Sequence, residues 1–503
     1  MTREHSLGRQ SVFSFLGSAT SAAMGLLLVV VLGRVLGEAG SGIVMQAVGV
    51  FMIALGISRC GMDSAAIWLL PRLSLDAKAH VAPTAWFMIL TSAAMGIICA
   101  GVITATVHLT GNGSEATRAI SASAWFLPPT AMLLTGLAAT RGLGGVAAYV
   151  LVGNVVLPTL RPVAIIVFVA AGAGAVGATI AWATPAVPAL ALALGVLVFQ
   201  IRRTAEGQRS TPMEFFRSGT PGRALRYAGP RVVSSTLEQV LAWVGIILVG
   251  FLAGPVAAGI YAAATRFATS GLIVDTAIRV TVSPLFSRLH HLGHIPELVH
   301  VYRRATSWLV LFSAPVFLIL AIFAPVALGL LGTGFTAGST TLAVMCLGAM
   351  VTLMAGNIHS ILLMGGHSGL AALNKVVVVS VNIILILVLT PLWGILGAAV
   401  AWAVSCLLDA SLATLQVHRV MQIRLPLTSG LRPLLGTLAV IGLPALTARA
   451  LLGATYPALA VALLVGGTGF LLWCRLDRTR LHLNQSLRQT ESSFASERTT
   501  SDA

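Results

Sequence analysis

Residues 174–183 read GAVGATIAWA and residues 394–403 read GILGAAVAWA, so that six of the ten aligned positions are identical. The identical positions include Trp182 and Trp402. Three glycines recur at a similar interval: Gly33, Gly37 and Gly42 correspond to Gly250, Gly254 and Gly259. Because self-similarity at a fixed spacing marks a duplicated structural unit, the chain is predicted to contain two copies of one module.

The composition indicates that both modules lie in a membrane. Of 503 residues, 57% are hydrophobic and only 9% are charged, and the mean hydropathy is +0.93. Such a chain has too little polar surface for a water-soluble domain. Apolar runs of about 20 residues, long enough to cross a hydrocarbon layer roughly 30 Å thick, predict fourteen transmembrane helices. Their expected bounds are 11–33, 40–58, 83–108, 119–137, 146–171, 175–199, 230–253, 256–283, 305–330, 338–364, 371–390, 394–417, 431–450 and 455–474.

Basic residues predict the orientation of these helices, because cytoplasmic loops are enriched in Lys and Arg. Of the 31 Lys and Arg residues, 25 fall on the same side as the N-terminus, and only Arg34, Arg118 and Arg449 fall in loops on the opposite side. We therefore expect both termini in the cytoplasm. The net charge of +16 agrees with this topology and with contact to anionic membrane lipids, and the scattered basic residues argue against a nucleic-acid partner.

The repeat divides the chain into an all-α polytopic arrangement of two lobes. A six-helix lobe is expected at 1–199 and a second at 230–418, joined by a cytoplasmic linker at 200–229. An extra helix pair, helices 13 and 14, occupies 419–475, and a polar tail at 476–503 is expected to be disordered. Because six spans separate the copies, both enter the membrane in the same sense, and their symmetry axis is expected along the membrane normal.

The sequence also indicates what powers the protein. It contains no GxxxxGK[ST] loop, which nucleotide-hydrolysing proteins use to bind phosphates, and its outer loops are too short to hold a catalytic domain. We therefore predict a protein that is not an enzyme and has no cofactor. Energy for transport would come from an H⁺ or Na⁺ gradient or from the gradient of the substrate itself.

Five charged residues are predicted to lie within spans: Arg161, Glu238, Arg266, Asp275 and Arg279. A charge at a helix centre costs about 2.5 to 3.5 kcal/mol on insertion scales. Five charges facing lipid would together cost on the order of 15 kcal/mol, which exceeds the net stability of a typical domain. We therefore expect these side chains to face a hydrated cavity between the two modules.

Arg161 and Arg266 are the strongest ligand candidates, because both lie too deep for their guanidinium groups to reach the interface easily. Guanidinium forks match phosphate oxygens in bidentate geometry, so a phosphate or pyrophosphate headgroup is the expected substrate group. With Arg34 and Arg279 they form the predicted substrate-binding set. The alternative is an internal ion pair, such as Arg161 with Glu238.

Two carboxylates are candidates for ion coupling. Glu238 and Asp275 lie in predicted spans, where a carboxylate has a raised proton affinity and can bind and release H⁺ or Na⁺. A permanent ion pair is the alternative for Glu238. His359 and Asn382 are weaker candidates for lining a route, because a lone polar residue in a bundle commonly bonds to a neighbouring helix.

A set of four charges predicts a gate. Asp275 and Arg279 are four residues apart and so share a helical face, and Arg59 and Asp63 are spaced in the same way in the first module with the signs reversed. Pairing Arg59 with Asp275 and Asp63 with Arg279 would form a latch between the modules. Alternatively, the arginines extend to the membrane interface and the acids only neutralise them.

Four sequence elements carry a resemblance to a known family. Residues 32–37 read LGRVLG, residues 226–230 read RYAGP, residues 254–261 read GPVAAGIY and residues 394–403 read GILGAAVAWA. In this order they resemble polysaccharide-precursor flippases, of the O-antigen and exopolysaccharide type, in the multidrug/oligosaccharidyl-lipid/polysaccharide (MOP) exporter superfamily.

The resemblance implies a two-lobed, V-shaped bundle in a bacterial cytoplasmic membrane. Such a protein flips an undecaprenyl-pyrophosphate-linked oligosaccharide from the inner to the outer leaflet by alternating access, with the headgroup in a cationic cavity. A polysaccharide polymerase or glycosyltransferases are the implied protein partners. Many relatives have an Asp in span seven near the position of Gly245, where this chain departs from the pattern, and this weakens the case for ion coupling.

Three other functions stay open on the sequence. A lipid II flippase of peptidoglycan synthesis would have the same number of spans. A multidrug or cation antiporter usually has acidic residues deep in its first lobe, whereas the first lobe here has no acidic residue at mid-membrane depth. A non-transporting membrane scaffold for polysaccharide synthesis would not depend on Arg161 or Arg266.

Overall fold

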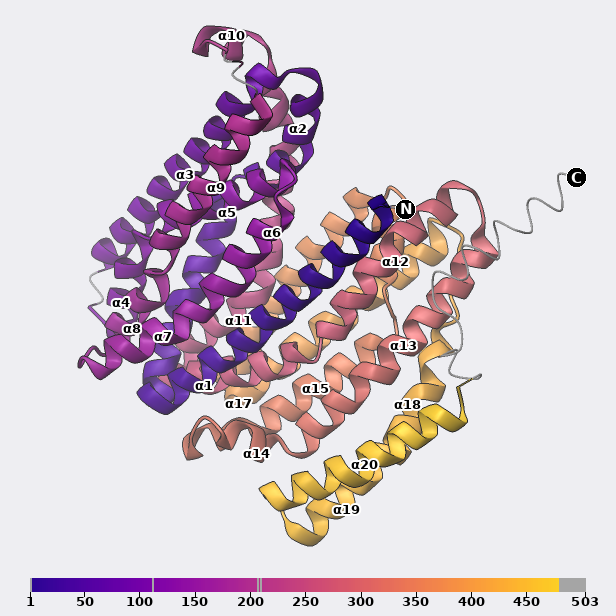
Figure 1. Cartoon of the computed structure of the whole chain (residues 1–503). Helices are drawn as coiled ribbons and strands as arrows, with labels where there is room; N and C mark the ends of the chain where they lie inside the picture. The colour runs from indigo at the N-terminus through magenta and orange to yellow at the C-terminus, as the bar shows by residue number, and fades with distance from the viewer. Residues whose placement is uncertain (1, 111–112, 206–207, 209, 479–503) are drawn as a thin grey trace, which may run out of the picture. The chain divides into compact units, whose positions relative to one another are not determined.

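The computed structural model describes residues 2–110, 113–205, 208 and 210–478, which are nearly all helical and contain no β-strand (Figure 1). The first part of the chain forms α1 (Thr2–Ser58), α2 (Met62–Asp76), α3 (Val81–Thr110), α4 (Glu115–Ala124), α5 (Leu127–Gly142), α6 (Val146–Ala148), α7 (Leu157–Ala170), α8 (Ala175–Ala183), α9 (Ala186–Ala205), α10 (Pro212–Arg217) and α11 (Thr220–Ser270). The second part forms α12 (Ile273–His291), α13 (Ile295–Ile322), α14 (Ala324–Gly329), α15 (Ser339–Leu353), α16 (Ile358–Met364), α17 (Ser368–Arg419), α18 (Leu431–Thr437), α19 (Leu443–Leu452) and α20 (Tyr456–Leu476).

Short helices of other types join these elements. The 3₁₀ helices are η1 (Lys78–His80), η3 (Thr333–Gly338) and η4 (Leu427–Gly430), and the π-helical turns are η2 (Tyr149–Val156) and η5 (Leu438–Gly442). Of the predicted disordered tail at 476–503, residues 479–503 lie outside the described residues.

Glycines divide three of the longest helices. In the described chain, ten helices are long and apolar enough to cross a membrane, and the bent pair α4 and α5 forms one further span. The helices α1, α11 and α17 contain 51 to 57 residues, about 75 to 85 Å at 1.5 Å per residue, and each is broken by a non-helical glycine: Gly37, Gly254 and Gly394. Counting each broken helix as two spans gives fourteen, and the predicted all-α polytopic fold is confirmed.

The repeated glycines adopt the same backbone conformation in both copies. Gly37 has φ 66° and ψ −170°, and Gly254 has φ 87° and ψ 173°. Only glycine occupies this region of backbone space without strain. The sequence repeat therefore marks a matching chain reversal after the first helix of each module.

The two copies pack directly against each other at these reversals. A Cβ atom placed on Gly42 would lie 1.8 Å from the carbonyl oxygen of Pro255, and one placed on Gly259 would lie 2.1 Å from that of Glu38. Glu38 and Pro255 are themselves equivalent positions of the repeat, as Gly42 and Gly259 are. The contact is therefore reciprocal, as an approximate two-fold axis requires, and it brings two helix backbones closer than any side chain allows.

The chain divides into two compact units. Unit 1 comprises Met1–Arg266, Leu331–Phe335 and Asn382–Ala398, and unit 2 comprises Phe267–Leu330, Thr336–Val381 and Ala399–Ala503. The core of unit 1 includes Leu69, Leu70, Met88 and Leu197 from α2, α3 and α9. The predicted lobes at 1–199 and 230–418, the linker at 200–229 and the extra pair at 419–475 stay predictions.

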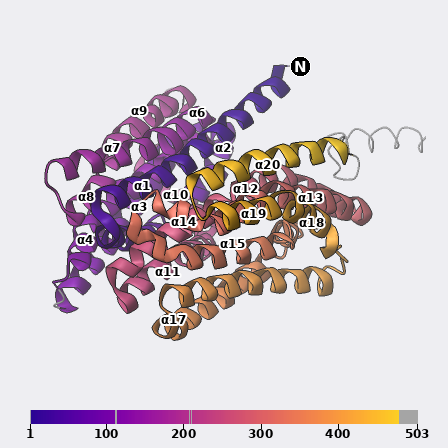
Figure 2. The same ribbon diagram turned by 90° about the horizontal axis from the view of Figure 1, so that it is seen from below.

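A second core lies in unit 2, where Phe286, Tyr302, Ile358 and Val417 bring together α12, α13, α16 and α17. The last two membrane helices, α19 and α20, lie side by side in both views (Figures 1 and 2). They bury Ala445, Ala448, Ala458 and Ala462 against the end of α13, and these small side chains allow the helices to approach closely.

Several predicted spans are interrupted: the one at 119–137 breaks between α4 and α5, the one at 338–364 breaks between α15 and α16, and the one at 256–283 is also broken. The expected helix at 256–283 ends at Ser270 and resumes at Ile273. A Cβ on Gly271 would lie 2.6 Å from the ring of Phe317, so only glycine fits at this break. As a result Arg266 and Asp275, which the sequence places in one span, lie on different helices.

Candidate functional site

Arg161 lies on α7, directly after the π-helical turn η2. Its Cζ atom is 4.2 Å from the centroid of the Trp182 ring, which is 2% exposed and makes an edge-to-face contact with Phe51 at 5.2 Å. A guanidinium over an indole face is stabilised by the ring quadrupole without a carboxylate partner. The buried Nε of Arg161 has no hydrogen-bond acceptor among the described residues, so the protein leaves one donor of this cation unsatisfied.

Arg266 has the same arrangement near the end of α11. Its Cζ atom is 4.2 Å from the centroid of the Trp243 ring, which is 7% exposed. A Cβ on Gly49 would come within 3.5 Å of this ring. Trp243 therefore packs against the same half of α1 that carries Phe51, the neighbour of Trp182. Both candidate arginines lie in unit 1 and stack on tryptophans that contact one helix.

Two of the other sequence candidates in unit 1, Glu238 and Arg34, are more exposed. Glu238 on α11 is exposed, and it forms no ion pair with Arg161 in the described structure, so the internal Arg161–Glu238 pair is not formed here. Arg34 is exposed on α1. Arg59 pairs with Asp63 one helical turn away, with Nη1 to Oδ2 at 2.9 Å. The proposed latch across the modules stays a prediction.

In unit 2, Asp275 on α12 accepts a hydrogen bond from Nδ2 of Asn357 at 2.9 Å. Arg279, one turn further along α12, is exposed and lies close enough to Asp275 and to His359 to interact with both electrostatically. Asp275 and Arg279, which the sequence places on one helical face, are therefore close enough to interact electrostatically. The Oδ1 atom of Asn357 is buried without a hydrogen-bond donor.

Sequence reasoning missed an ionic group nearby in the same unit. Nζ of Lys375 lies 2.5 Å from Oδ2 of Asp409, and Nε2 of His359 lies 3.4 Å from the same oxygen. Asp409 is 9% exposed, and its second oxygen is buried without a donor. Lys375 is one of only two lysines and lies inside the predicted span at 371–390, so its position and rarity were the signals that could have identified it.

The departure at Gly245 has a steric reason. A Cβ at this position would lie 2.9 Å from the hydroxyl oxygen of Tyr261 and 3.1 Å from its ring. Tyr261 is 2% exposed and fills the space that an aspartate at position 245 would need. Among the residues that the structure describes, no three His, Cys, Asp or Glu side chains gather in a way that could hold a metal ion.

Comparison with known families identifies the chain. A family model described as Polysaccharide biosynthesis protein matches residues 7–290, which is more than half of the sequence. The chain belongs to this family. The family membership inferred from the four sequence elements is therefore confirmed. No curated protein sequence matches the chain.

Solved transporters share the fold. The lipid II flippase MurJ in an inward closed conformation aligns with a TM-score of 0.67 at 14% identity, covering 93% of this chain and 99% of that one. An inward-facing multidrug resistance MATE family transporter of the MOP superfamily aligns with a TM-score of 0.61 at 16% identity, covering 80% and 94%. The Vibrio cholerae MATE transporter VcmN in its bent form gives 0.55 at 17% identity, covering 84% and 98%.

At these identities the likeness shows the fold alone. Family and fold together identify the chain as a multi-pass membrane protein of the polysaccharide biosynthesis family, with the fold that these solved transporters share.

Proposed function

We propose that the chain flips a polyprenyl-pyrophosphate-linked oligosaccharide from the inner to the outer leaflet of a bacterial cytoplasmic membrane by alternating access. Both termini lie in the cytoplasm in this proposal, and the chain works as a transporter without enzymatic activity. Glycosyltransferases supply the glycan on the cytoplasmic side, and a polysaccharide polymerase consumes it on the other side. Arg161 and Arg266 bind the pyrophosphate, with Arg34 and Arg279 completing the binding set.

The observation that carries this proposal is the pairing of Arg161 with an indole and not with a carboxylate. A buried cation neutralised by an acid would have its charge and hydrogen bonds satisfied by the protein. Arg161 over Trp182 keeps an unsatisfied Nε, and an anionic oxygen would satisfy it. A pyrophosphate provides such oxygens in the geometry that guanidinium groups match.

An ion gradient is the proposed energy source, with H⁺ or Na⁺ as the coupling ion. Glu238 and Asp275 are the proposed carriers. The exposure of Glu238 and the single hydrogen bond of Asp275 to Asn357 leave both carboxylates with unused acceptor sites. The Arg59, Asp63, Asp275 and Arg279 latch is the proposed gate, and reversing the charges of Asp63 and Arg279 together should restore transport lost in either single reversal.

A reconstituted flipping assay tests the function. Proteoliposomes would contain the purified chain and a fluorescent undecaprenyl-pyrophosphate oligosaccharide, and an impermeant quencher would report its appearance in the outer leaflet. Arg161→Ala should lower the flipping rate roughly 10- to 100-fold, because hydrogen bonds to charged groups contribute about 1.5 to 3 kcal/mol. Arg161→Lys should be intermediate, since the charge stays and the planar fork is lost.

Arg72→Ala is the matched control. The Cζ atom of Arg72 lies 4.4 Å from the centroid of the Trp68 ring in unit 1, so the variant loses a similar contact outside the proposed site and should flip at the normal rate. If Arg161→Ala and Arg266→Ala flip as fast as Arg72→Ala, the arginines do not bind the transported group and a scaffold function is favoured.

A lipid II flippase is the second candidate, because the MurJ structure aligns with nearly the whole chain. The same assay distinguishes the two with lipid II as the labelled substrate. Faster flipping of lipid II than of the oligosaccharide precursor would assign the chain to peptidoglycan synthesis.

A further inference from the structure

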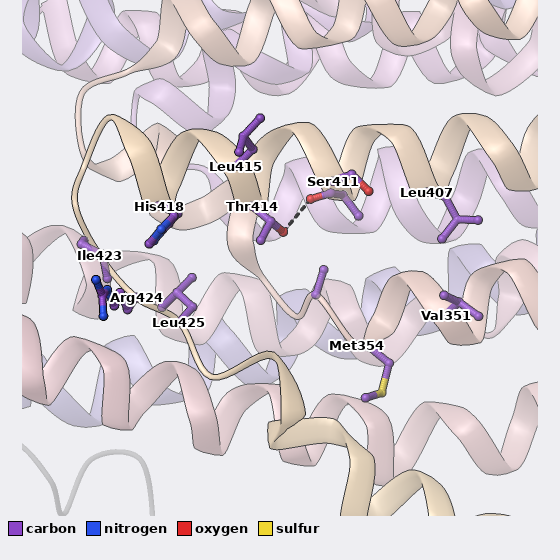
Figure 3. A pocket seen from close by; sticks show the side chains of 12 residues that line it. Val351, Met354, Leu407, Ser411, Thr414, Leu415, His418, Ile423, Arg424 and Leu425 are labelled. Carbon is purple, nitrogen blue, oxygen red and sulfur yellow. Dashed lines mark hydrogen bonds between the residues drawn. The ribbon is translucent and has the colours of Figure 1, made fainter.

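Unit 2 contains a cavity of about 650 Å³, which lies between the end of α15, the C-terminal half of α17 and the loop after α17 (Figure 3). This volume falls within the roughly 300 to 1,000 Å³ of ligand-binding pockets. Most of its wall is apolar and is formed by Val351, Met354, Leu407, Leu415, Ile423 and Leu425. Neither predicted arginine site includes these residues.

The cavity has one basic end. Figure 3 shows His418 and Arg424 beside Ile423 at one end, and Leu407 and Val351 at the opposite end. Both basic side chains are exposed, and neither forms an ion pair or hydrogen bond with any residue that the structure describes. Because α17 is long and apolar enough to cross a membrane and ends at Arg419, we infer that the basic end lies at the depth of lipid headgroups.

The basic end is held in place by bonds within the loop. Nε2 of Gln422 donates to the carbonyl oxygen of Arg419 at 2.7 Å, which caps α17. The backbone N–H of Ile423 donates to the carbonyl of Val417 at 3.3 Å, and the Ile423 side chain is 2% exposed. Arg424 therefore follows an anchored residue.

The opposite wall is anchored in a similar way. The hydroxyl of Tyr302 donates to the carbonyl of Ala355 at 2.8 Å, and Tyr302 is itself fully buried. The cavity is thus bounded by fixed backbone on two sides.

We propose that this cavity binds an anionic glycerophospholipid from the leaflet at which α17 ends. One acyl chain lies along the apolar wall toward Leu407, and the phosphate lies at Arg424 with His418 beside it. An apolar cavity with a cationic end is complementary to a lipid. Its acyl chain moves from the hydrocarbon of the bilayer to the apolar wall of the cavity, while the headgroup stays in water. Arginine binds phosphate oxygens through its planar fork.

Charge favours this occupant over the transported substrate. Arg424 supplies one permanent positive charge. One phosphodiester carries one negative charge and is balanced by Arg424 alone. A pyrophosphate diester carries two and would leave one unbalanced. The proposal is independent of which glycan the chain flips.

The test measures lipid retention by the full-length chain. The purified protein would be placed in phosphatidylcholine nanodiscs that contain phosphatidylglycerol as the probe. Native mass spectrometry would release the protein from the nanodisc in the gas phase and count the lipids that stay bound to it. Arg424→Gln should weaken retention of phosphatidylglycerol about tenfold. Leu407→Trp, which fills the apolar end without changing charge, should weaken it to a similar extent, and Ala410→Leu is a smaller change at the same wall should the tryptophan prevent folding.

Arg419→Gln is the matched control, because Arg419 is an exposed arginine at the same helix end that does not line the cavity. It should retain the lipid normally. Equal losses in Arg419→Gln and Arg424→Gln would reduce the effect to general surface charge and overturn the proposal. Retention that survives both Leu407→Trp and Ala410→Leu would exclude an acyl chain in the cavity. Displacement of the probe by equimolar undecaprenyl pyrophosphate would assign the cavity to the transported substrate instead.

Discussion

Substituting Gly42 by alanine should destabilise the chain far more than a single methyl group suggests. The added Cβ would lie 1.8 Å from the carbonyl oxygen of Pro255, whereas real Cβ contacts are essentially never shorter than 3.0 Å. The two backbones must therefore move apart by most of the difference between these distances. Since both groups belong to helix backbone and not to flexible side chains, neither can rotate away. Forced overpacking of this kind costs typically about 1 to 3 kcal/mol and occasionally more.

A control glycine should respond in the opposite direction. Gly101 lies within α3, and a Cβ added there would meet nothing within 4 Å. Alanine is favoured over glycine in a helix interior by roughly 0.5 to 1 kcal/mol, so Gly101→Ala should be slightly stabilising. The two substitutions add the same atom to a helix, and only the surroundings differ.

The reciprocal contact gives a second test. Gly259→Ala should cost about as much as Gly42→Ala, because its Cβ would lie 2.1 Å from the carbonyl of Glu38. The double variant should cost less than the sum of the two, because helices already separated by one methyl group accommodate the second at lower cost.

Thermal unfolding in a fixed detergent measures these differences. As a local readout, Ser41→Cys would be introduced into a variant with its five native cysteines replaced. Ser41 is 3% exposed beside Gly259, so its thiol should react slowly with a polar maleimide until Gly259→Ala separates the helices. If Gly42→Ala unfolds at or above the wild-type temperature, or if the double variant shows the full sum, the reciprocal backbone contact is wrong.

Three other parts of the chain provide independent tests. Gly254→Ala should lose roughly 1 to 3 kcal/mol of stability, because its φ of 87° is strained for any side chain, and thermal unfolding measures this. Lys375→Met should destabilise by about 3 kcal/mol by leaving Asp409 buried without its cation, and adding Asp409→Leu should recover most of the loss in the same assay. In α10, hydrogen bonds from the backbone and side chain of Thr211 lower the pKa of Glu214. The stability that this cap gives to α10 is fully present above the ordinary pKa of the carboxyl group, and it is lost as the pH falls through the lowered pKa of Glu214. Hydrogen-exchange protection of α10 should therefore decrease in that pH range. Glu214→Gln should remove this pH dependence.

The sequence predicted the fold because the bilayer imposes simple requirements. A backbone that crosses hydrocarbon must satisfy its hydrogen bonds within a helix, so a run of about 20 apolar residues is sufficient to indicate a span. The repeated glycines predicted the duplication, and the structure shows why they recur: only glycine adopts the conformation of Gly37 and Gly254 without strain. The break at Gly271 was not predicted, because the residue that packs closely against it, Phe317, is distant in sequence.

The partners of the charged residues could not be predicted in the same way. Deep position alone distinguished Arg161, but nothing local to it indicates that Trp182 supplies its π face. The Lys375 and Asp409 pair joins positions on the two halves of α17, on either side of the break at Gly394. The periodicity of apolar residues shows which face of one helix is apolar. Contacts between side chains of different helices depend on how each helix is rotated and tilted, and this cannot be inferred from the sequence of either helix.

The repeat itself supplies a signal for function, because the charged residues of the candidate sites have uncharged counterparts in the other copy. At the offset that relates Trp182 to Trp402, the counterpart of Arg161 is Val381. At the offset that relates Gly42 to Gly259, the counterpart of Arg266 is Gly49. The second difference is structural as well, since Trp243 packs against Gly49 and stacks with Arg266. A Cβ at position 49 would lie 3.0 Å from the side chain of Ile247 and in ordinary contact, at 3.5 Å, with the Trp243 ring.

The same comparison applies to the ion pair in unit 2, where the counterparts of Lys375 and Asp409 in the first copy are Val155 and Ala189. Duplication therefore supplies a similar glycine reversal to both modules, at Gly37 and Gly254, and each module then carries a charged group that its copy lacks. Installing Arg266→Gly and Gly49→Arg together moves the arginine to the other position beside Trp243 and should remove flipping. The indole of Trp243 is near both positions, but the wild-type helix geometry places only the Arg266 guanidinium over the ring, at 4.2 Å from its centroid. Flipping at the normal rate in this exchanged variant would show that the position of the cation does not matter, and the asymmetry between the modules would then have no functional meaning.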